Sequence, residues 1–306
     1  MTIFSQRFDR RTAVSVLWIT VVFVITFFLL RALPDAKCGF LHYEEVVNAE
    51  GQIEFCATNH AGFLDLSKLS YPVRMELETG SPLVAGQEQD ITLRLETSGG
   101  MPIAGHELAI THTEKMHIML IDPSVEDYHH IHPEVMGTDG RYRFRFTPKS
   151  SGPYAVYAEI VPLRTRRQVI ATGHLEVSGE SRKGHFESNR ICQSGGLYFE
   201  LFGDDDRLKT GRDYRFELRV SEDGGNAADL ESIMGAKGHL VAFDAECRGF
   251  AHMHPISSVR AEKPSADAEA PLAFLFNVPN PGWYRIFAQV QVDGAVVFGR
   301  FDLWVE

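Results

Sequence analysis

The sequence predicts an all-β protein with two tandem immunoglobulin-like antiparallel β-sandwiches that follow a single N-terminal transmembrane helix. Three observations lead to this fold class. Short segments in which apolar and polar residues alternate follow one another along most of the chain, which is the pattern of half-buried strands. The same order of segments occurs twice. One uncharged apolar stretch, residues 12–30, precedes them all.

The apolar stretch, TAVSVLWITVVFVITFFLL, is long enough to span a membrane as a helix, because nineteen residues at about 1.5 Å each match a hydrocarbon core of ~30 Å. Arg7, Arg10 and Arg11 precede it, so the positive-inside rule places the N-terminus in the cytoplasm. We expect a single-pass protein of the cytoplasmic (inner) membrane with its bulk in the periplasm. A cleaved signal peptide is the alternative, although Pro34-Asp35-Ala36 makes a poor cleavage site.

Changes in composition divide the chain into five segments. They are a cytoplasmic tip and transmembrane anchor (1–33), a disulfide-stapled juxtamembrane module (34–70), a first sandwich (71–178), a linker (179–190) and a second sandwich (191–306). The linker is polar and contains Gly and Ser, as connecting segments do. The juxtamembrane module is too short to bury a core of its own, which is why we expect a disulfide within it.

All four cysteines follow the apolar stretch: Cys38, Cys56, Cys192 and Cys247. An even number of cysteines in an oxidising compartment predicts two disulfides. Proximity in the sequence suggests the pairs Cys38–Cys56 and Cys192–Cys247, the second of which would join the start of the second sandwich to its central hairpin. Metal ligation by these cysteines is the alternative, but no C-x-x-C spacing supports it.

Both repeats contain a lone histidine that is followed, thirteen positions later, by His-x-His-Pro. The six histidines are His117, His130 and His132 in the first copy and His239, His252 and His254 in the second. Turn-forming residues lie midway, so we expect two antiparallel hairpins with His117 opposite His132 and His239 opposite His254. Residues two apart in a strand share a face, and three imidazoles therefore cluster on one face of each hairpin.

Three neutral imidazoles with an open fourth position suit copper, with zinc as the alternative ion. Met119 lies two residues after His117 and is a candidate soft fourth ligand for Cu(I). A competing interpretation is that the histidines are purely structural, buried and hydrogen-bonded to one another or to the backbone. Spacing alone does not decide between a metal site and a structural corner.

Several classes of function lack the features that they require. A net charge of −11 argues against a nucleic-acid-binding protein, which needs a basic face. The sequence has no Gly-rich phosphate loop, no C-x-x-C-H haem motif, no H-E-x-x-H motif and no nucleophile elbow. We therefore expect no enzyme activity, and a copper oxidoreductase has no motif in its favour.

The two hairpins resemble the small extracytoplasmic β-sandwich domains of the YtkA-like and FixH-like type. The residues that carry the resemblance are Met116-His117-Ile118 with His130-Ile131-His132-Pro133, and Gly238-His239-Leu240 with His252-Met253-His254-Pro255. The later segments Gly152-Pro153-Tyr154 and Gly282-Trp283-Tyr284 also fit. The resemblance implies a membrane-tethered sandwich connected with heavy-metal or copper handling and with oxidase maturation.

These features together predict a membrane-anchored periplasmic protein that binds copper and acts as a carrier, buffer or assembly helper. Its partners would be the membrane and a metal-accepting protein or membrane complex. The alternative function is a non-catalytic structural or protein-interaction module with structural histidines. In that case the basic segment with Arg164, Arg166 and Arg167 is a candidate contact site.

Overall fold

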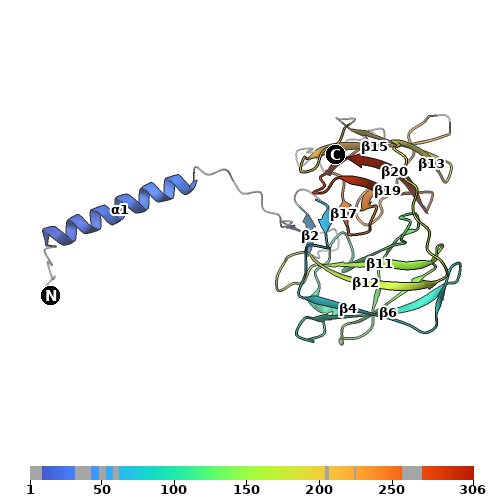
Figure 1. Ribbon diagram of the computed structural model, residues 1–306, viewed down its shortest axis with the longest axis horizontal. Helices are drawn as coiled ribbons and strands as arrows, with labels where there is room; N and C mark the ends of the chain where they lie inside the picture. The colour runs from blue at the N-terminus through green and yellow to red at the C-terminus, as the bar shows by residue number, and fades with distance from the viewer. Residues whose placement is uncertain are drawn as a thin grey trace. The chain divides into compact units, whose positions relative to one another are not determined.

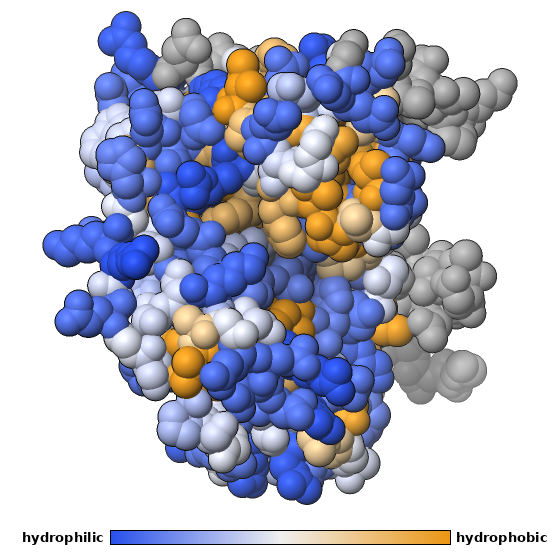
Figure 2. All heavy atoms as spheres, turned by 90° about the vertical axis from the view of Figure 1, so that its right-hand side faces the viewer, coloured by the Kyte–Doolittle hydropathy of each residue, from blue (hydrophilic) through white to orange (hydrophobic). Residues whose placement is uncertain are grey.

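The computed structural model describes residues 9–31, 43–47, 53–57, 62–203, 207–223, 225–256 and 271–306, with the backbone alone at 43–47 and 53–57. The chain forms two compact units, Met1–Phe40 and Leu41–Glu306 (Figure 1). Polar side chains cover most of the face shown in Figure 2, and apolar side chains gather in its upper half.

The first unit contains one helix, α1 (Arg10–Arg31), which has no buried residue. Its 22 residues are long and apolar enough to cross a membrane. Apolar side chains surround this helix on all sides, which is the pattern of a helix that meets lipid. A signal sequence near the N-terminus has the same length and composition, so both interpretations of this segment stay open.

The second unit begins with a two-stranded ribbon, β1 (Tyr43–Val47) and β2 (Ile53–Ala57), and continues into two sandwiches. One sheet of the first sandwich has the order β4 (Val73–Thr79), β6 (Gln89–Thr97), β10 (Arg141–Phe146) and β9 (Glu134–Val135). The other sheet has the order β5 (Leu83–Val84), β12 (Val169–Ser178), β11 (Gly152–Ile160), β7 (Met116–Ile121) and β8 (Tyr128–Ile131). A short 3-10 turn, η1 (Gly105–Glu107), lies between β6 and β7.

Alternation of side chains along the strands builds the core of this sandwich. Strand β10 buries Tyr142, Phe144 and Phe146 and exposes the three arginines between them. Such a strand removes one row of apolar surface from water, at about 25 cal/mol per Å², while its other face stays solvated. The alternating pattern in the sequence predicted this strand and its inward face.

The second sandwich repeats this arrangement. One sheet has the order β13 (Ile191–Ser194), β14 (Leu197–Gly203), β15 (Tyr214–Glu222) and β18 (Leu272–Phe276). The other has the order β20 (Ala295–Val305), β19 (Gly282–Val292), β16 (His239–Asp244), β17 (Gly249–Met253) and β3 (Leu64–Asp65). Within each sandwich the paired strands are antiparallel except β12 and β5. The expected fold class, two antiparallel β-sandwiches after an apolar N-terminal helix, is confirmed.

Strand β3 occupies a place that the sequence did not predict. It precedes the first sandwich in the chain, yet it pairs with β17 of the second sandwich, with Asp65 opposite Gly249. Phe63, which is 7% exposed, lies in the core of the second sandwich and makes an edge-on ring contact with Tyr284 at 5.2 Å. The segment before the first sandwich therefore extends a sheet of the second one.

The two sandwiches pack against each other through their five-stranded sheets. Strands β7 and β16 are buried at every position, without alternation. One row of their side chains faces the core of its own sandwich and the other row joins a shared apolar cluster, which we call the interface cluster. Its buried members are Met119, Ile121, Val125, Tyr128, Ala155, Tyr157, Ile170, Val241, Phe243, Phe250 and Phe287. A strand covered on both faces is a continuous apolar run, as both of these are.

The predicted Cys192–Cys247 disulfide is wrong, because both residues are free thiols. Cys192 packs against the core of the second sandwich, and its sulfur accepts the backbone N–H of Arg300 at 3.1 Å. Cys247 packs against the interface cluster, and its thiol donates to the carbonyl of Asp122 at 3.6 Å. The cysteines thus face different apolar cores. The predicted Cys38–Cys56 pair lies outside the residues whose side chains the structure describes.

Candidate metal centre

The hairpins β7–β8 and β16–β17 have the register that the histidine spacing predicts. Ile118 pairs with Ile131, so one further step along the hairpin places His117 opposite His132. Leu240 pairs with Met253, which places His239 opposite His254 in the same way. The first hairpin lies at the edge of its sheet, whereas β3 covers the second hairpin.

The turns of the two hairpins are built alike. Val125 and Cys247 occupy matching positions with positive φ angles of 57° and 51°. The Asp122 carboxylate accepts the backbone N–H groups of Glu126 and Asp127 at 2.7 and 2.8 Å. Asp244 accepts the backbone N–H of Arg248 at 2.7 Å in the other turn. These side-chain bonds fix the turn, and the turn fixes which residues face each other across the hairpin.

The first triad consists of His117, His130 and His132, whose ligand atoms all lie within 4.8 Å of one another. The His117 Nε2 atom donates to the carbonyl of Thr111 at 2.8 Å, because a carbonyl only accepts, so its Nδ1 carries a lone pair. The Nδ1 atom of His130 donates in the same way to Gln289 Oε1 at 3.0 Å, which leaves a lone pair on its Nε2.

Those two lone pairs face each other. His117 Nδ1 lies 3.2 Å from His130 Nε2 and 3.2 Å from His132 Nε2. A proton on His132 Nε2 can satisfy the second contact, but the lone pair of His130 still points at that of His117. Two facing lone pairs do not make a hydrogen bond. A cation between them would coordinate both, which is the arrangement of a metal ligand set.

The second triad, His239, His252 and His254, has the same tight grouping of ligand atoms within 4.8 Å. His252 Nδ1 lies 3.1 Å from Glu159 Oε2 and donates to it, so its Nε2 carries a lone pair. Four buried ring nitrogens of this triad have no hydrogen-bond partner among the described residues: both of His239, Nε2 of His252 and Nδ1 of His254. Each unpaired buried polar atom costs about 1–3 kcal/mol, and coordination of an ion would remove that cost.

Burial sets the charge state of these imidazoles. It lowers the pKa of His117, His130, His239 and His254 well below the usual 6.5, and neighbouring imidazoles lower it further. Burial first, and then His252, lower the pKa of His132 to about 4. These five imidazoles are therefore neutral near pH 7, and the neutral form is the one that ligates a metal.

Two polar residues that contact the triads were not predicted from the sequence. Glu159 accepts a hydrogen bond from His252, and Gln289 accepts one from His130. The His112 ring is stacked on the His254 ring, with centroids 3.4 Å apart and planes at 15°. Burial, followed by His252, lowers the pKa of His112 to about 4. The signal for Glu159 was its place as the one charged residue in β11, and Gln289 is likewise a polar residue in an apolar run of β19.

Glu159 is held as a carboxylate inside the protein. Burial alone raises its pKa, but its hydrogen bond and electrostatic interaction with His252, its interaction with His112 and a hydrogen bond from Gln168 outweigh burial and bring the pKa below its usual value. The residue is only 7% exposed, so this negative charge acts on His252 with little screening by water.

Met119 lies in the interface cluster, fully buried and opposite His130 in the register. Apolar packing alone explains why Met119 is buried there. Its role as a fourth metal ligand stays a prediction. Met253, between two histidines, faces the core of the second sandwich instead.

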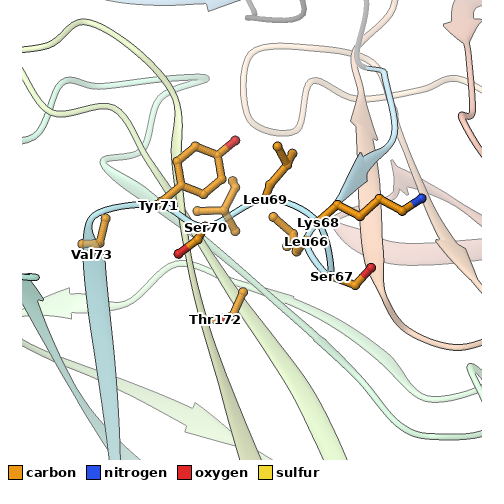
Figure 3. A pocket seen from close by; sticks show the side chains of 9 residues that line it. Leu66, Ser67, Lys68, Leu69, Ser70, Tyr71, Val73 and Thr172 are labelled. Carbon is orange, nitrogen blue, oxygen red and sulfur yellow. The ribbon is translucent and has the colours of Figure 1, made fainter.

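A surface pocket of about 350 Å³ lies apart from the triads, since no histidine lines it. Residues 66–71, Val73, Ile170 and Thr172 form its wall (Figure 3). Lys68, its one charged lining residue, extends its ammonium group away from Tyr71 and bonds to Asp65 and Asn280 at 3.0 and 2.9 Å. The pocket therefore offers no unpaired charge to a ligand.

Two stretches of the chain, residues 70–177 and 193–306, match a family model described as a domain of unknown function (DUF8832). The chain belongs to the DUF8832 family. Each match contains one sandwich and one histidine triad, so this DUF8832 protein carries the domain twice. No curated protein matches the sequence.

Solved structures also match this DUF8832 protein, at low sequence identity and low TM-score. One is FdeC, an adhesin of Escherichia coli, with 15% identity and a TM-score of 0.23; the match covers 76% of this chain and 64% of the adhesin chain, which is less than two thirds of its length. Another is the fibronectin(III)-like modules of CbhA from Clostridium thermocellum, with 12% identity and a TM-score of 0.20 over 76% of this chain and 94% of the other.

Proposed function

We propose that this DUF8832 protein binds copper or zinc ions outside the cytoplasm through its two histidine triads, and that it serves as a carrier, buffer or assembly helper for metal ions. The observation that supports this most strongly is the set of buried ring nitrogens without partners in the second triad. Structural histidines would be hydrogen-bonded, because an unpaired buried nitrogen destabilises the fold.

The ligand set supports exchange of an ion better than permanent storage. Three imidazoles at about 2.0–2.1 Å from an ion leave a fourth position open to solvent or to a ligand of a partner protein. His130 and His132 of the first triad are only half-buried, so an acceptor can approach that side. The resemblance of the hairpins to YtkA-like and FixH-like domains favours copper as the ion.

Helix α1 supports a location at the cytoplasmic membrane, with the sandwiches on the periplasmic side. The arginines before the helix give this orientation by the positive-inside rule. The net charge of −11 would also raise the local concentration of cations near the sandwiches.

The direct test is the number of ions that the full-length protein holds in detergent. Equilibrium dialysis against Zn²⁺ or Cu²⁺, followed by elemental analysis, is expected to give two equivalents. The double variant His130→Ala/His132→Ala should hold one equivalent, and so should His252→Ala/His254→Ala. The exposed residues His106 and His174 supply the control, because His106→Ala/His174→Ala removes two histidines without touching a triad. A folded wild-type protein that holds no ion would contradict the proposal.

A structural or interaction module is the second candidate, and the hydrogen bonds from His130 to Gln289 and from His252 to Glu159 favour it, since both connect the sandwiches. Thermal unfolding separates the two functions. A ligand at 100 times its Kd stabilises a protein by about 2.7 kcal/mol. Metal binding therefore predicts a clear rise in Tm with added Zn²⁺, whereas purely structural histidines predict none.

A further inference from the structure

The two triads are neighbours across the packed sandwiches. The His252 ring of the second triad lies 5.1 Å from the His130 ring and 5.5 Å from the His117 ring, measured between centroids. The ligand atoms nevertheless fall into two separate groups of three. The arrangement therefore provides two adjacent positions for ions and not one site with six ligands.

Each sandwich orients one ligand of the other sandwich. His130 of the first sandwich donates to Gln289 of the second, and His252 of the second donates to Glu159 of the first. The two orienting residues are equivalent in the repeat. Glu159 lies opposite His117 in the pairing of β11 with β7, and Gln289 lies opposite His239 in the pairing of β19 with β16.

This near-symmetric pair differs in charge. A carboxylate that accepts the N–H of a ligand imidazole makes the other ring nitrogen a stronger donor and fixes the ring, and the removal of such a partner typically costs 10–100-fold in metal affinity. A neutral amide fixes the ring but supplies no charge. The second triad therefore has a carboxylate behind His252, whereas the first triad has only an amide behind His130.

We propose that the two triads form one two-ion centre at the junction of the sandwiches, in which the second triad binds the first ion tightly and the first triad holds a second, more weakly bound ion. This inference rests on the proposed function. Repulsion between two neighbouring cations in a buried site acts in the same direction, because the ion that arrives second meets the charge of the first. The first triad, in which two of the three histidines are half-buried, would then be the position that releases its ion to an acceptor.

The test measures the zinc affinity of each triad separately in the full-length protein, by competition with a chelator of known affinity. The variant His130→Ala/His132→Ala reports the second triad, and His252→Ala/His254→Ala reports the first. The second triad is expected to bind at least tenfold more tightly. Glu159→Gln, which makes the two orienting residues alike, should weaken the second triad by about 10–100-fold. Gln289→Glu should strengthen the first triad by a similar factor.

Glu176→Gln is the matched control, because it removes the same charge from an exposed position on β12, next to β11. Melting curves identify any variant that has lost its fold, and the Gln289→Glu gain of affinity cannot arise from misfolding. Equal affinities of the two triads, or an effect of Glu159→Gln no larger than that of Glu176→Gln, would overturn the ordered centre and leave the proposed function standing. No zinc binding by any folded form would overturn both.

Discussion

The proton on three of the six triad imidazoles is placed by the atom behind the ring. The Thr111 carbonyl accepts the N–H of His117, Gln289 Oε1 accepts that of His130 and Glu159 Oε2 accepts that of His252. The six ligand histidines were predictable because their spacing along one hairpin determines which of them meet. The atoms behind them were not, because they belong to other strands or to the other sandwich, and one sequence contains no signal for contacts between distant segments.

Cysteine chemistry provides a prediction at this scale. Burial, and then Asp244 and Asp122, raise the pKa of the Cys247 thiol to about 12, so little thiolate exists near neutral pH. We expect Cys247 to react slowly with iodoacetamide in the native protein. After denaturation without reductant, Cys192 and Cys247 should both carry the label in a mass spectrum. A disulfide-linked pair of peptides containing these two residues would contradict the assignment of both cysteines as free thiols.

Asp65 provides a prediction about pH. Burial alone would raise its pKa, but hydrogen bonds from Ser67, Asn280 and Lys68 lower it to about 2. An unfolded Asp has a pKa of about 3.9, so the unfolded chain binds the proton first as the pH falls. The stability contributed by Asp65 is therefore complete above about pH 4 and is lost between about pH 4 and pH 2.

Urea unfolding monitored by tryptophan fluorescence tests whether the stability contributed by Asp65 falls as the pH falls. The difference in unfolding free energy between wild type and Asp65→Asn should be largest at pH 6 and smaller at pH 3. Asp139→Asn, at an exposed pair with Arg141, is the control and should change stability by less than about 1 kcal/mol. A difference that grows on acidification would rule out this assignment of the Asp65 carboxylate.

At the scale of elements, the hairpins were predictable and strand β3 was not. Each hairpin has turn chemistry at its midpoint and a histidine pattern at both ends, so its register is specified locally. Strand β3 has two residues, and its partner strand lies far along the chain. A segment of that length has no periodicity to detect, and its place is decided by distant partners: the edge of β17, the core around Phe63 and the hydrogen bonds with Asn280.

Gly249 is the residue that permits β3 to pair with β17. A Cβ atom built at this position lies 1.7 Å from the carbonyl oxygen of Leu64, which is far inside contact distance. Gly249→Ala should therefore displace β3, reduce the stability by a few kcal/mol and expose residues 62–68 to proteases. Limited proteolysis with mass spectrometry measures this exposure.

Gly62→Ala is the control for that experiment, since a Cβ at Gly62 has no atom within 4 Å. It adds the same methyl group to the 62–68 segment itself, at the residue that bridges to Asn277. Cleavage of both variants at equal rates would mean that the segment does not depend on β17.

At the scale of the whole molecule, the two sandwiches were predicted and their packing was not. Alternation in the outer strands indicates one buried face, and β10 has one. The runs MHIMLI and HLVAFD have apolar residues on both faces, which indicates cover on both sides but does not identify the cover. The structure shows that the cover is the other sandwich, so the two triads meet.

Substitutions at two fully buried phenylalanines distinguish the role of the interface cluster from that of a sandwich core. Phe243 belongs to the interface cluster, and Phe274 belongs to the core of the second sandwich. Either change to Ala should cost about 3–5 kcal/mol. Only Phe243→Ala should weaken zinc binding at both triads, because it loosens the contact through which Glu159 and Gln289 reach their histidines.

Calorimetry and zinc titration of the two variants give the comparison. We expect Phe243→Ala to separate the unfolding of the two sandwiches into two transitions, whereas Phe274→Ala should mainly lower the transition of the second sandwich. If both variants leave the affinity of the first triad unchanged, the interface does not contribute to that triad.

The pairing of β3 with β17 also determines the order of events during synthesis. Leu64 and Asp65 leave the ribosome long before Gly249 and Phe250, so this pairing cannot form while the first sandwich is being made. Strand β20, at the end of the chain, must join β19 before the second sandwich is complete. Contacts between such distant segments form late and slowly. A nascent chain can expose the first hairpin before Gln289 exists, and an ion captured then would meet an unfinished ligand set. Under the proposed function, correct loading therefore requires that both sandwiches have folded.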